Sequence, residues 1–176
     1  MNQLLVATIL MPLIGAILIA VLAHFGRDVV RWLALAITVV TLLMAGRLVW
    51  NFEPANLDYA ATSIQWGAPA ENAGAVTGML DVRFSVGLDG LGIWLFALSA
   101  LLLVTSVLVS WEAITERPAL FFGMLLLLEF GCLGVFAARD LIMFYIFFEF
   151  TLIPLFFLIG IWGSEQRRYA AIKFFI

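Results

Sequence analysis

Residues 120–162 read LFFGMLLLLEFGCLGVFAARDLIMFYIFFEFTLIPLFFLIGIW, two apolar runs separated by the charged pair Arg139-Asp140. Each run is about 20 residues long, which is the length that an α-helix needs to cross the hydrocarbon core of a bilayer. The charged pair leaves room only for a very tight turn. The stretch therefore predicts two antiparallel membrane-spanning helices, over Leu120–Ala138 and Leu141–Trp162.

The composition of the whole chain also indicates a membrane protein. Of the 176 residues, 65% are apolar and 12% are charged, against about 45–50% and about 25% in soluble domains. We therefore predict an all-α integral membrane protein, a polytopic helical bundle with five complete spanning helices. A sixth segment starts near Tyr169 and stops at Ile176, so we interpret it as the start of a truncated helix. The other three predicted spans are Leu4–Ala23, Val29–Trp50 and Leu91–Trp111.

The connection between the second and third spans, residues 51–88, contains Pro54, Pro69 and several glycines and asparagines. These residues are typical of a surface loop with little regular structure. Asp89 follows this loop and is well placed to accept hydrogen bonds from the first free amides of the third helix, as an N-cap residue does. The nearby glycines do not follow the order of a dinucleotide-binding motif, so we expect no nucleotide site.

Arginines near the predicted helix ends indicate an orientation. Five lie at one end of the bundle and three at the other, and the richer end is expected to be cytoplasmic. The amino terminus and the long loop are then outside. The five are Arg27, Arg31, Arg117, Arg167 and Arg168, and the three are Arg47, Arg83 and Arg139.

Several kinds of chemistry are excluded by the residues that the chain lacks. Cys132 is the only cysteine, which excludes an internal disulfide and a zinc or iron–sulfur site held by cysteines. His24 is the only histidine, and the net charge of −3 argues against nucleic acid as a partner. We expect no catalytic residue, no metal and no cofactor in this chain.

Two glutamates inside the opening stretch, Glu129 and Glu149, mark the candidate functional site. A carboxylate at the centre of a spanning helix costs roughly 2.5–3.5 kcal/mol on insertion scales, so its default interpretation is functional. At 1.5 Å per residue, both glutamates are about 15 Å from Arg139, which is about half of the hydrocarbon thickness. The sequence leaves open whether the two side chains face each other.

Polar features surround Glu149. Pro154 lacks an amide and frees the carbonyl of Phe150, one residue from the glutamate. A free carbonyl beside a carboxylate is a suitable place for bound water, which a proton relay requires. Tyr145, one turn earlier, can add a hydrogen bond.

Each candidate also has a structural alternative. Glu149 can be a neutral carboxylic acid that holds two helices together. For Glu129 we weigh the structural and the functional interpretations equally. Lys173 either extends its ammonium group to the membrane interface or takes part in transport.

Five segments carry a family resemblance, with the glutamate, the proline five residues later and the Trp-Gly pair as its strongest signal. The chain resembles the antiporter-like membrane subunits of respiratory complex I, of which subunit M of bacterial NADH:quinone oxidoreductase and chain 4 of the mitochondrial enzyme are the matching type. Phe148 stands where that family often has tryptophan. The segments are Gly87–Leu91 (GLDGL), Gly134–Asp140 (GVFAARD), Phe148–Pro154 (FEFTLIP), Leu158–Gly163 (LIGIWG) and Arg168–Phe175 (RYAAIKFF).

This resemblance implies a truncated antiporter-like fold, since the family has two inverted repeats of five helices. Residues 1–118 would form three accessory helices with the non-cytoplasmic loop 51–88, and residues 119–176 would begin the first repeat. The family's glutamate in the fifth helix maps onto Glu149. Glu129 is not carried over, and Lys173 matches neither of the family's lysine partners.

The function that the resemblance implies is proton translocation coupled to quinone reduction elsewhere in the complex. The chain would be part of an enzyme only as a subunit of this translocase. Its expected partners are the other membrane subunits of complex I, the lipid bilayer and protons, in the inner (plasma) membrane of a bacterium. Two alternatives are a subunit of a multi-subunit sodium/proton antiporter and a membrane scaffold that transports nothing.

Overall fold

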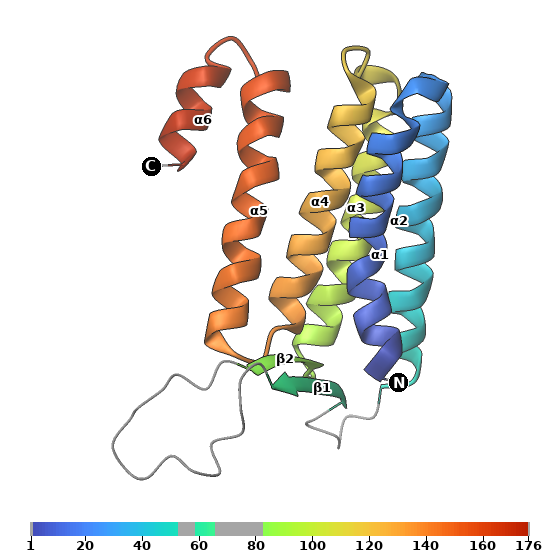
Figure 1. Cartoon of the computed structure of the whole chain (residues 1–176), viewed down its shortest axis with the longest axis vertical. Helices are drawn as coiled ribbons and strands as arrows, with labels where there is room; N and C mark the ends of the chain where they lie inside the picture. The colour runs from blue at the N-terminus through green and yellow to red at the C-terminus, as the bar shows by residue number, and fades with distance from the viewer. Residues whose placement is uncertain (1, 53–58, 66–82, 176) are drawn as a thin grey trace.

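The computed structural model describes residues 2–52, 59–65 and 83–175, and it is a bundle of antiparallel helices closed at one end by a β-hairpin (Figure 1). Its elements in chain order are α1 (Asn2–Leu22), the short 3-10 helix η1 (Ala23–Phe25), α2 (Arg27–Trp50), β1 (Tyr59–Gln65), β2 (Arg83–Leu88), α3 (Gly92–Ala113), α4 (Pro118–Ala137), α5 (Leu141–Trp162) and α6 (Arg167–Phe175).

The five predicted spans are confirmed. Among the described residues, five helices are long and apolar enough to cross a membrane, and their ends agree with the predicted ends within two residues. The span Leu141–Trp162 is recovered without change. The agreement follows from the solvent: a backbone in hydrocarbon must satisfy its own hydrogen bonds, so long apolar runs become helices.

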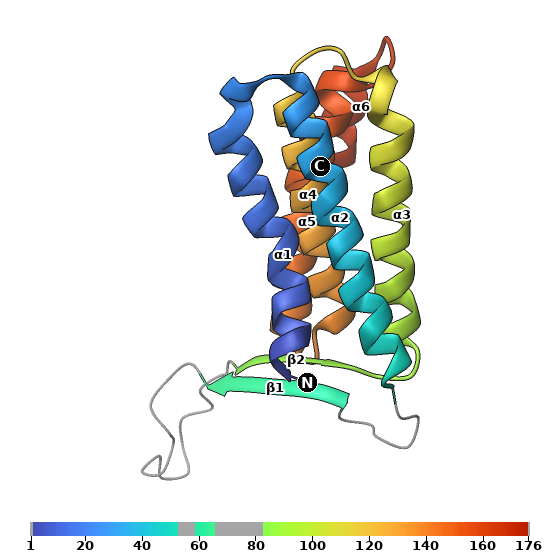
Figure 2. The same cartoon turned by 90° about the vertical axis from the view of Figure 1, so that its right-hand side faces the viewer.

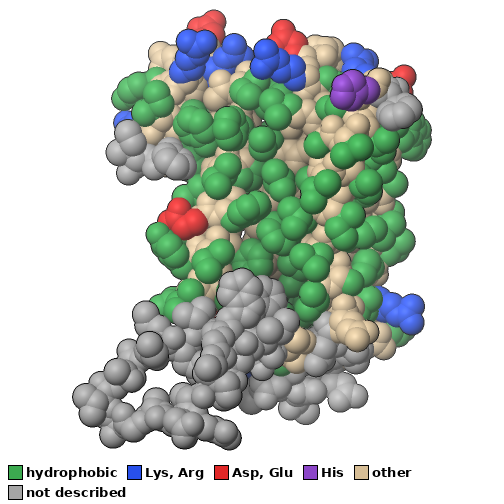
Figure 3. Space-filling model, in the orientation of Figure 1, with side chains coloured by type: hydrophobic (Ala, Val, Ile, Leu, Met, Phe, Trp, Pro, Cys, Tyr) green, Lys and Arg blue, Asp and Glu red, His purple; other side chains and the backbone are tan. Residues whose placement is uncertain are grey.

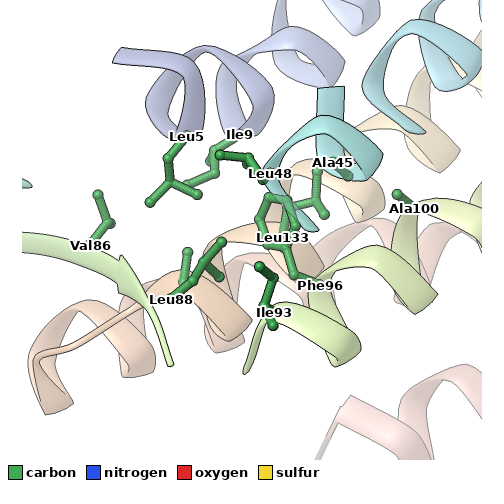
Figure 4. Packing of buried hydrophobic residues seen from close by; sticks show 11 residues of the cluster. Leu5, Ile9, Ala45, Leu48, Val86, Leu88, Ile93, Phe96, Ala100 and Leu133 are labelled. Atoms are coloured by element: carbon green, nitrogen blue, oxygen red, sulfur yellow. The ribbon is translucent and has the colours of Figure 1, made fainter. Parts of the chain in front are cut away.

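Helix α4 is the centre of the bundle, because it packs against α1, α2, α3 and α5. Figures 1 and 2 show α5 and α6 to one side of the group that α1 to α4 form. Two clusters of buried apolar residues hold that group together. The hairpin-end cluster (Figure 4) consists of Leu5, Ile9, Ala45, Leu48, Val86, Leu88, Ile93, Phe96, Ala100, Leu133 and Ala137. The arginine-end cluster consists of Ala16, Ile19, Val30, Ala34, Ile37, Leu103, Val107, Phe122, Leu125 and Leu126.

The α4–α5 contact is close because glycines face α5. A Cβ atom added to Gly131 would lie 2.5 Å from Cγ2 of Thr151, and one added to Gly134 would overlap the ring of Phe147. Phe147 and Thr151 are both buried. Small residues are enriched at helix contacts inside membranes for this reason, since they let two backbones approach.

The expectation of an irregular loop over residues 51–88 is wrong for the part that the structure describes. β1 and β2 form an antiparallel pair across the end of the bundle (Figure 2). Val86 and Leu88 are buried in the hairpin-end cluster. The amide of Arg139 donates to the carbonyl of Ser85 (3.0 Å), and Val86 forms an isolated β-bridge with Ala138. The hairpin therefore joins the α4–α5 turn.

The opposite end of the bundle carries the five predicted arginines. The α1–α2, α3–α4 and α5–α6 connections all lie there, and Figure 3 shows Lys and Arg side chains gathered at that end. Tryptophans accompany them: Trp32 meets Trp111 edge to face (5.1 Å between ring centroids), and Trp162 donates to the carbonyl of Glu116 (3.1 Å). Such rings mark a membrane interface. That this end is cytoplasmic stays a prediction.

The predicted role of Asp89 is confirmed in substance. Its carboxylate accepts a hydrogen bond from the amide of Gly92 (2.5 Å), the first residue of α3, and its carbonyl accepts one from Ile93 (3.1 Å). Leu91 occupies the N-cap position itself and offers no side-chain bond. Asp89 thus accepts from the first amide of α3 as predicted, but it lies two residues before the N-cap position instead of occupying it.

Candidate functional site

Glu129 is buried completely inside the α1–α4 group. Neither carboxylate oxygen has a hydrogen-bond partner among the described residues. Along α4, the preceding buried residues Leu125 and Leu126 belong to the arginine-end cluster, whereas Leu133 belongs to the hairpin-end cluster. The glutamate therefore lies between the two apolar clusters. An unpaired buried polar group costs stability, so this position requires an explanation.

The register of α1 on α4 places Pro12 at the level of Glu129. Gly15 approaches Leu126, and Leu5 and Ile9 share a cluster with Leu133. Pro12 lies between these contacts, inside α1, which continues as one helix from Asn2 to Leu22. Because proline has no amide, the carbonyl four residues earlier, that of Thr8, loses its helical partner. This carbonyl lies near the level of Leu133, about one turn from Glu129.

Nearby hydroxyl groups do not account for Glu129. Three buried ones donate to carbonyls of their own helices: Thr8 to Leu4 (2.7 Å), Thr41 to Ile37 (2.9 Å) and Ser99 to Phe96 (2.9 Å). Each such hydroxyl keeps lone pairs that can accept a hydrogen bond. The carboxyl group of Glu129 itself has no partner among the described residues.

Glu149 lies on the side of α5 that faces away from α4. It is exposed, whereas Phe147 and Thr151, two residues to either side, are buried. The hydroxyl group of Tyr145, one turn earlier, interacts with this carboxylate. The exposed rings of Phe144 and Phe148 stack on the same helix, with centroids 6.1 Å apart.

The two glutamates do not face each other. Gly131 of α4 meets Phe147 and Thr151 of α5. Glu129 is two residues from Gly131, and Glu149 is two residues from both Phe147 and Thr151. Two residues correspond to about 200° of rotation around a helix. Each carboxyl group therefore points away from the α4–α5 contact, although both lie about 12 Å from the helix ends at the turn.

Pro154 is a buried residue inside α5, which continues as a helix from Leu141 to Trp162. Its missing amide leaves the Phe150 carbonyl without a helical donor, as predicted. One turn away, the Thr151 hydroxyl donates to the carbonyl of Phe148 (2.7 Å). The Phe148 carbonyl is thus already occupied, and the Phe150 carbonyl is the free backbone acceptor next to Glu149.

Lys173 lies on the short helix α6 and has an environment unlike that of Glu129. It is exposed on α6, and its ammonium nitrogen lies 5.8 Å from the centre of the Tyr169 ring. This contact is a cation–π interaction between residues one turn apart. The structure does not bring Lys173 together with Glu129.

One buried charge was not expected from the sequence. Arg31 was interpreted as a residue that sets orientation, but its side chain is only 5% exposed, 4.0 Å from Asp28. Its guanidinium donates to the carbonyl of Ile114 (3.1 Å), which connects the start of α2 to the residue after α3. Pro12, inside the first apolar run, is a second feature of the sequence that the prediction of the site did not include.

Five apolar spans, two of them with an internal proline and two with a carboxyl group near mid-depth, are consistent with an antiporter-like helical membrane protein. Residues 138–176, which include Glu149, match the family model described as NADH:quinone oxidoreductase/Mrp antiporter, transmembrane. The fold is also that of a chain from the membrane-bound sulfane sulfur reductase, an archaeal respiratory membrane complex. The TM-score is 0.71 at 21% identity, over 98% of this chain and 33% of that chain.

Curated relatives agree with this class. NADH-quinone oxidoreductase subunit M of Rhodobacter capsulatus is 35% identical over 180 residues, covering 100% of this chain and 33% of the relative. NAD(P)H-quinone oxidoreductase chain 4 1 of Nostoc sp. is 32% identical over 172 residues, covering 98% and 30%. F(420)H(2) dehydrogenase subunit M of Methanosarcina mazei is 42% identical over 97 residues, covering 55% and 20%. The chain thus resembles complex I antiporter-like membrane subunits and spans about a third or less of their length.

Proposed function

We propose that this chain is part of a proton-translocating membrane subunit of a complex of the NADH:quinone oxidoreductase type, in a bacterial inner membrane. Redox chemistry in other subunits would drive the translocation. Two of the relatives are named as subunits of quinone oxidoreductases and one as a subunit of an F(420)H(2) dehydrogenase. The electron donor thus differs among the relatives, which supports a role for this chain in the membrane part that they share.

The observation that carries the proposal is the position of Glu149. Exposure of its carboxylate to lipid would cost roughly 2.5–3.5 kcal/mol. Only 22% of the α5 span is buried, against 39–44% for the other four spans. We infer that the outward face of α5 packs against further protein, and that Glu149 faces a hydrated passage or a cationic partner there. A carboxyl group in that setting can bind and release a proton.

Glu129 is proposed as a second, internal proton-binding group. Its complete burial and the lack of a hydrogen-bond partner among the described residues support this role. Because it faces away from α5, a proton would have to pass around α4 to move between the two glutamates. We therefore assign Glu149 the main role and Glu129 a subordinate one. Lys173, which is exposed on α6 and contacts Tyr169, is a third candidate that ranks below both.

The test is NADH-driven proton pumping and quinone reduction in membranes that contain the complete subunit in its complex. Glu149→Gln keeps the shape and removes the titrating group, so both activities should fall about tenfold or more at normal complex levels. Glu149→Asp should retain part of the activity. Glu165→Gln, which removes an exposed carboxylate after α5, is the matched control. Normal pumping in Glu149→Gln would favour the scaffold alternative.

A sodium/proton antiporter subunit is the second candidate, because the family description also names the Mrp antiporter. The two functions differ in what drives transport. A subunit of the first kind copurifies with quinone reductase activity and pumps when NADH is supplied. A subunit of the second kind moves protons in response to an imposed sodium gradient without any electron donor.

A further inference from the structure

An open apolar groove lies between α1 and the first half of α4, at the arginine end of the bundle. Its volume is about 570 Å³, within the range of about 300–1,000 Å³ that is typical of ligand sites. Figure 2 shows the carboxyl-terminal half of α1 leaning away from the other helices. The walls are made by small residues, including Ala16 and Ala20 of α1 and Gly123 of α4. Neither Glu129 nor Glu149 lines it.

The mouth of the groove carries positive charge. Arg27 and Arg117, both exposed, line it together with Gly26 and Pro118. The acidic residues Asp28 and Glu116 are adjacent in sequence but are not among the lining residues. Helices α2 and α4 both begin at this mouth, so their first amides add to the positive potential.

The length of the groove matches one leaflet of a bilayer. Along α4 it extends from Pro118 to Leu127, which corresponds to about 14 Å. Half of a hydrocarbon core is about 15 Å. The two arginines are therefore at headgroup level when the apolar walls are at acyl-chain level.

We propose that this groove binds an anionic phospholipid from the surrounding leaflet. One acyl chain lies between α1 and α4, and the phosphate is held by Arg27 and Arg117. Basic pockets between membrane helices recognise anionic headgroups in this way. The proposal does not depend on proton translocation, since it concerns a different face of the bundle.

The charge at the mouth favours a lipid over a transmembrane helix as the occupant. An anionic headgroup can pair with Arg27 and Arg117 at the interface, whereas an apolar helix would bring no counter-charge to them. The two arginines also favour an anionic lipid over a neutral one.

The test uses the complete subunit in phosphatidylcholine nanodiscs that contain phosphatidylglycerol as a minor component. Native mass spectrometry then counts the lipids of each kind that stay bound. The double variant Arg27→Gln/Arg117→Gln should bind phosphatidylglycerol about 30-fold more weakly than the wild type. Gly123→Leu should have the same effect by filling the groove. Arg167→Gln/Arg168→Gln removes the same charge at the same end and should retain the lipid.

Three results would overturn the proposal. The first is unchanged phosphatidylglycerol retention in both groove variants. The second is equal retention of phosphatidylcholine, which would mean that the arginines recognise no headgroup. The third concerns the assembled complex: a photoreactive residue at Met124, in the groove wall, should crosslink to lipid, and an adduct with another subunit would mean that protein covers the groove.

Discussion

Replacing Gly134 by alanine should weaken the α4–α5 contact. The added methyl group would overlap the ring of Phe147, which is 5% exposed and has little room to turn. Overpacking of this kind costs about 1–3 kcal/mol. Against it stands the helix-forming advantage of alanine over glycine, about 1 kcal/mol. The net expectation is a loss of up to about 2 kcal/mol.

Gly46→Ala is the matched control. Gly46 lies inside α2, and a Cβ atom there would meet no atom within 4 Å. The same substitution should therefore stabilise the protein by up to about 1 kcal/mol. Gly134→Ala should be less stable than the wild type and Gly46→Ala more stable. The free energies of unfolding of the two variants should therefore differ by about 1–3 kcal/mol.

The assay is denaturant unfolding of the complete subunit in detergent micelles, followed by tryptophan fluorescence. A second measurement is proton pumping, because displacement of Phe147 moves the helix that carries Glu149. If Gly134→Ala proved as stable as Gly46→Ala and pumped normally, Phe147 would not be confined by α4, and the argument from close packing would be wrong.

Two further predictions concern the arginine end. Arg31→Met removes the hydrogen bond to Ile114 and should lower the free energy of unfolding by about 1–3 kcal/mol. The control, Arg168→Met at an exposed position, should change this free energy little. Equal losses of the two variants in thermal unfolding would contradict a bridging role for Arg31. In intact cells, single cysteines placed over residues 51–58 should react with an impermeant outside reagent and those over residues 164–168 should not, and the reverse pattern would invert the predicted orientation.

The spans could be predicted because a single segment in hydrocarbon can satisfy its backbone hydrogen bonds only as a helix. Asp89 could be predicted for a similar reason, since a helix start needs acceptors for its free amides. The hairpin was missed although β2 carries the alternation Phe84, Val86, Leu88. The prolines and glycines around it favour an irregular loop, whereas an apolar residue at every second position indicates a strand with one buried face.

The site was predicted in depth but not in direction. Distance along a helix follows from residue number, so the similar depth of Glu129 and Glu149 was accessible from the sequence. Rotation depends on which face packs, and Gly131 and Gly134, on one side of α4, were the available signal. The burial of Arg31 could not be predicted, because a long cationic side chain near a helix end usually reaches water.

The bonds between the hairpin and the α4–α5 turn are made by main-chain atoms of Ser85, Val86, Ala138 and Arg139. Such bonds depend on backbone geometry rather than on side-chain identity, and only proline at the donor position would abolish the Arg139 bond. Most side chains on the two segments can therefore diverge during evolution while the attachment persists. Gly87 is an exception, because a Cβ atom there would lie 2.6 Å from the Arg139 side chain. Relatives with little sequence in common can keep the same attachment between the segment that precedes α3 and the turn that leads into α5.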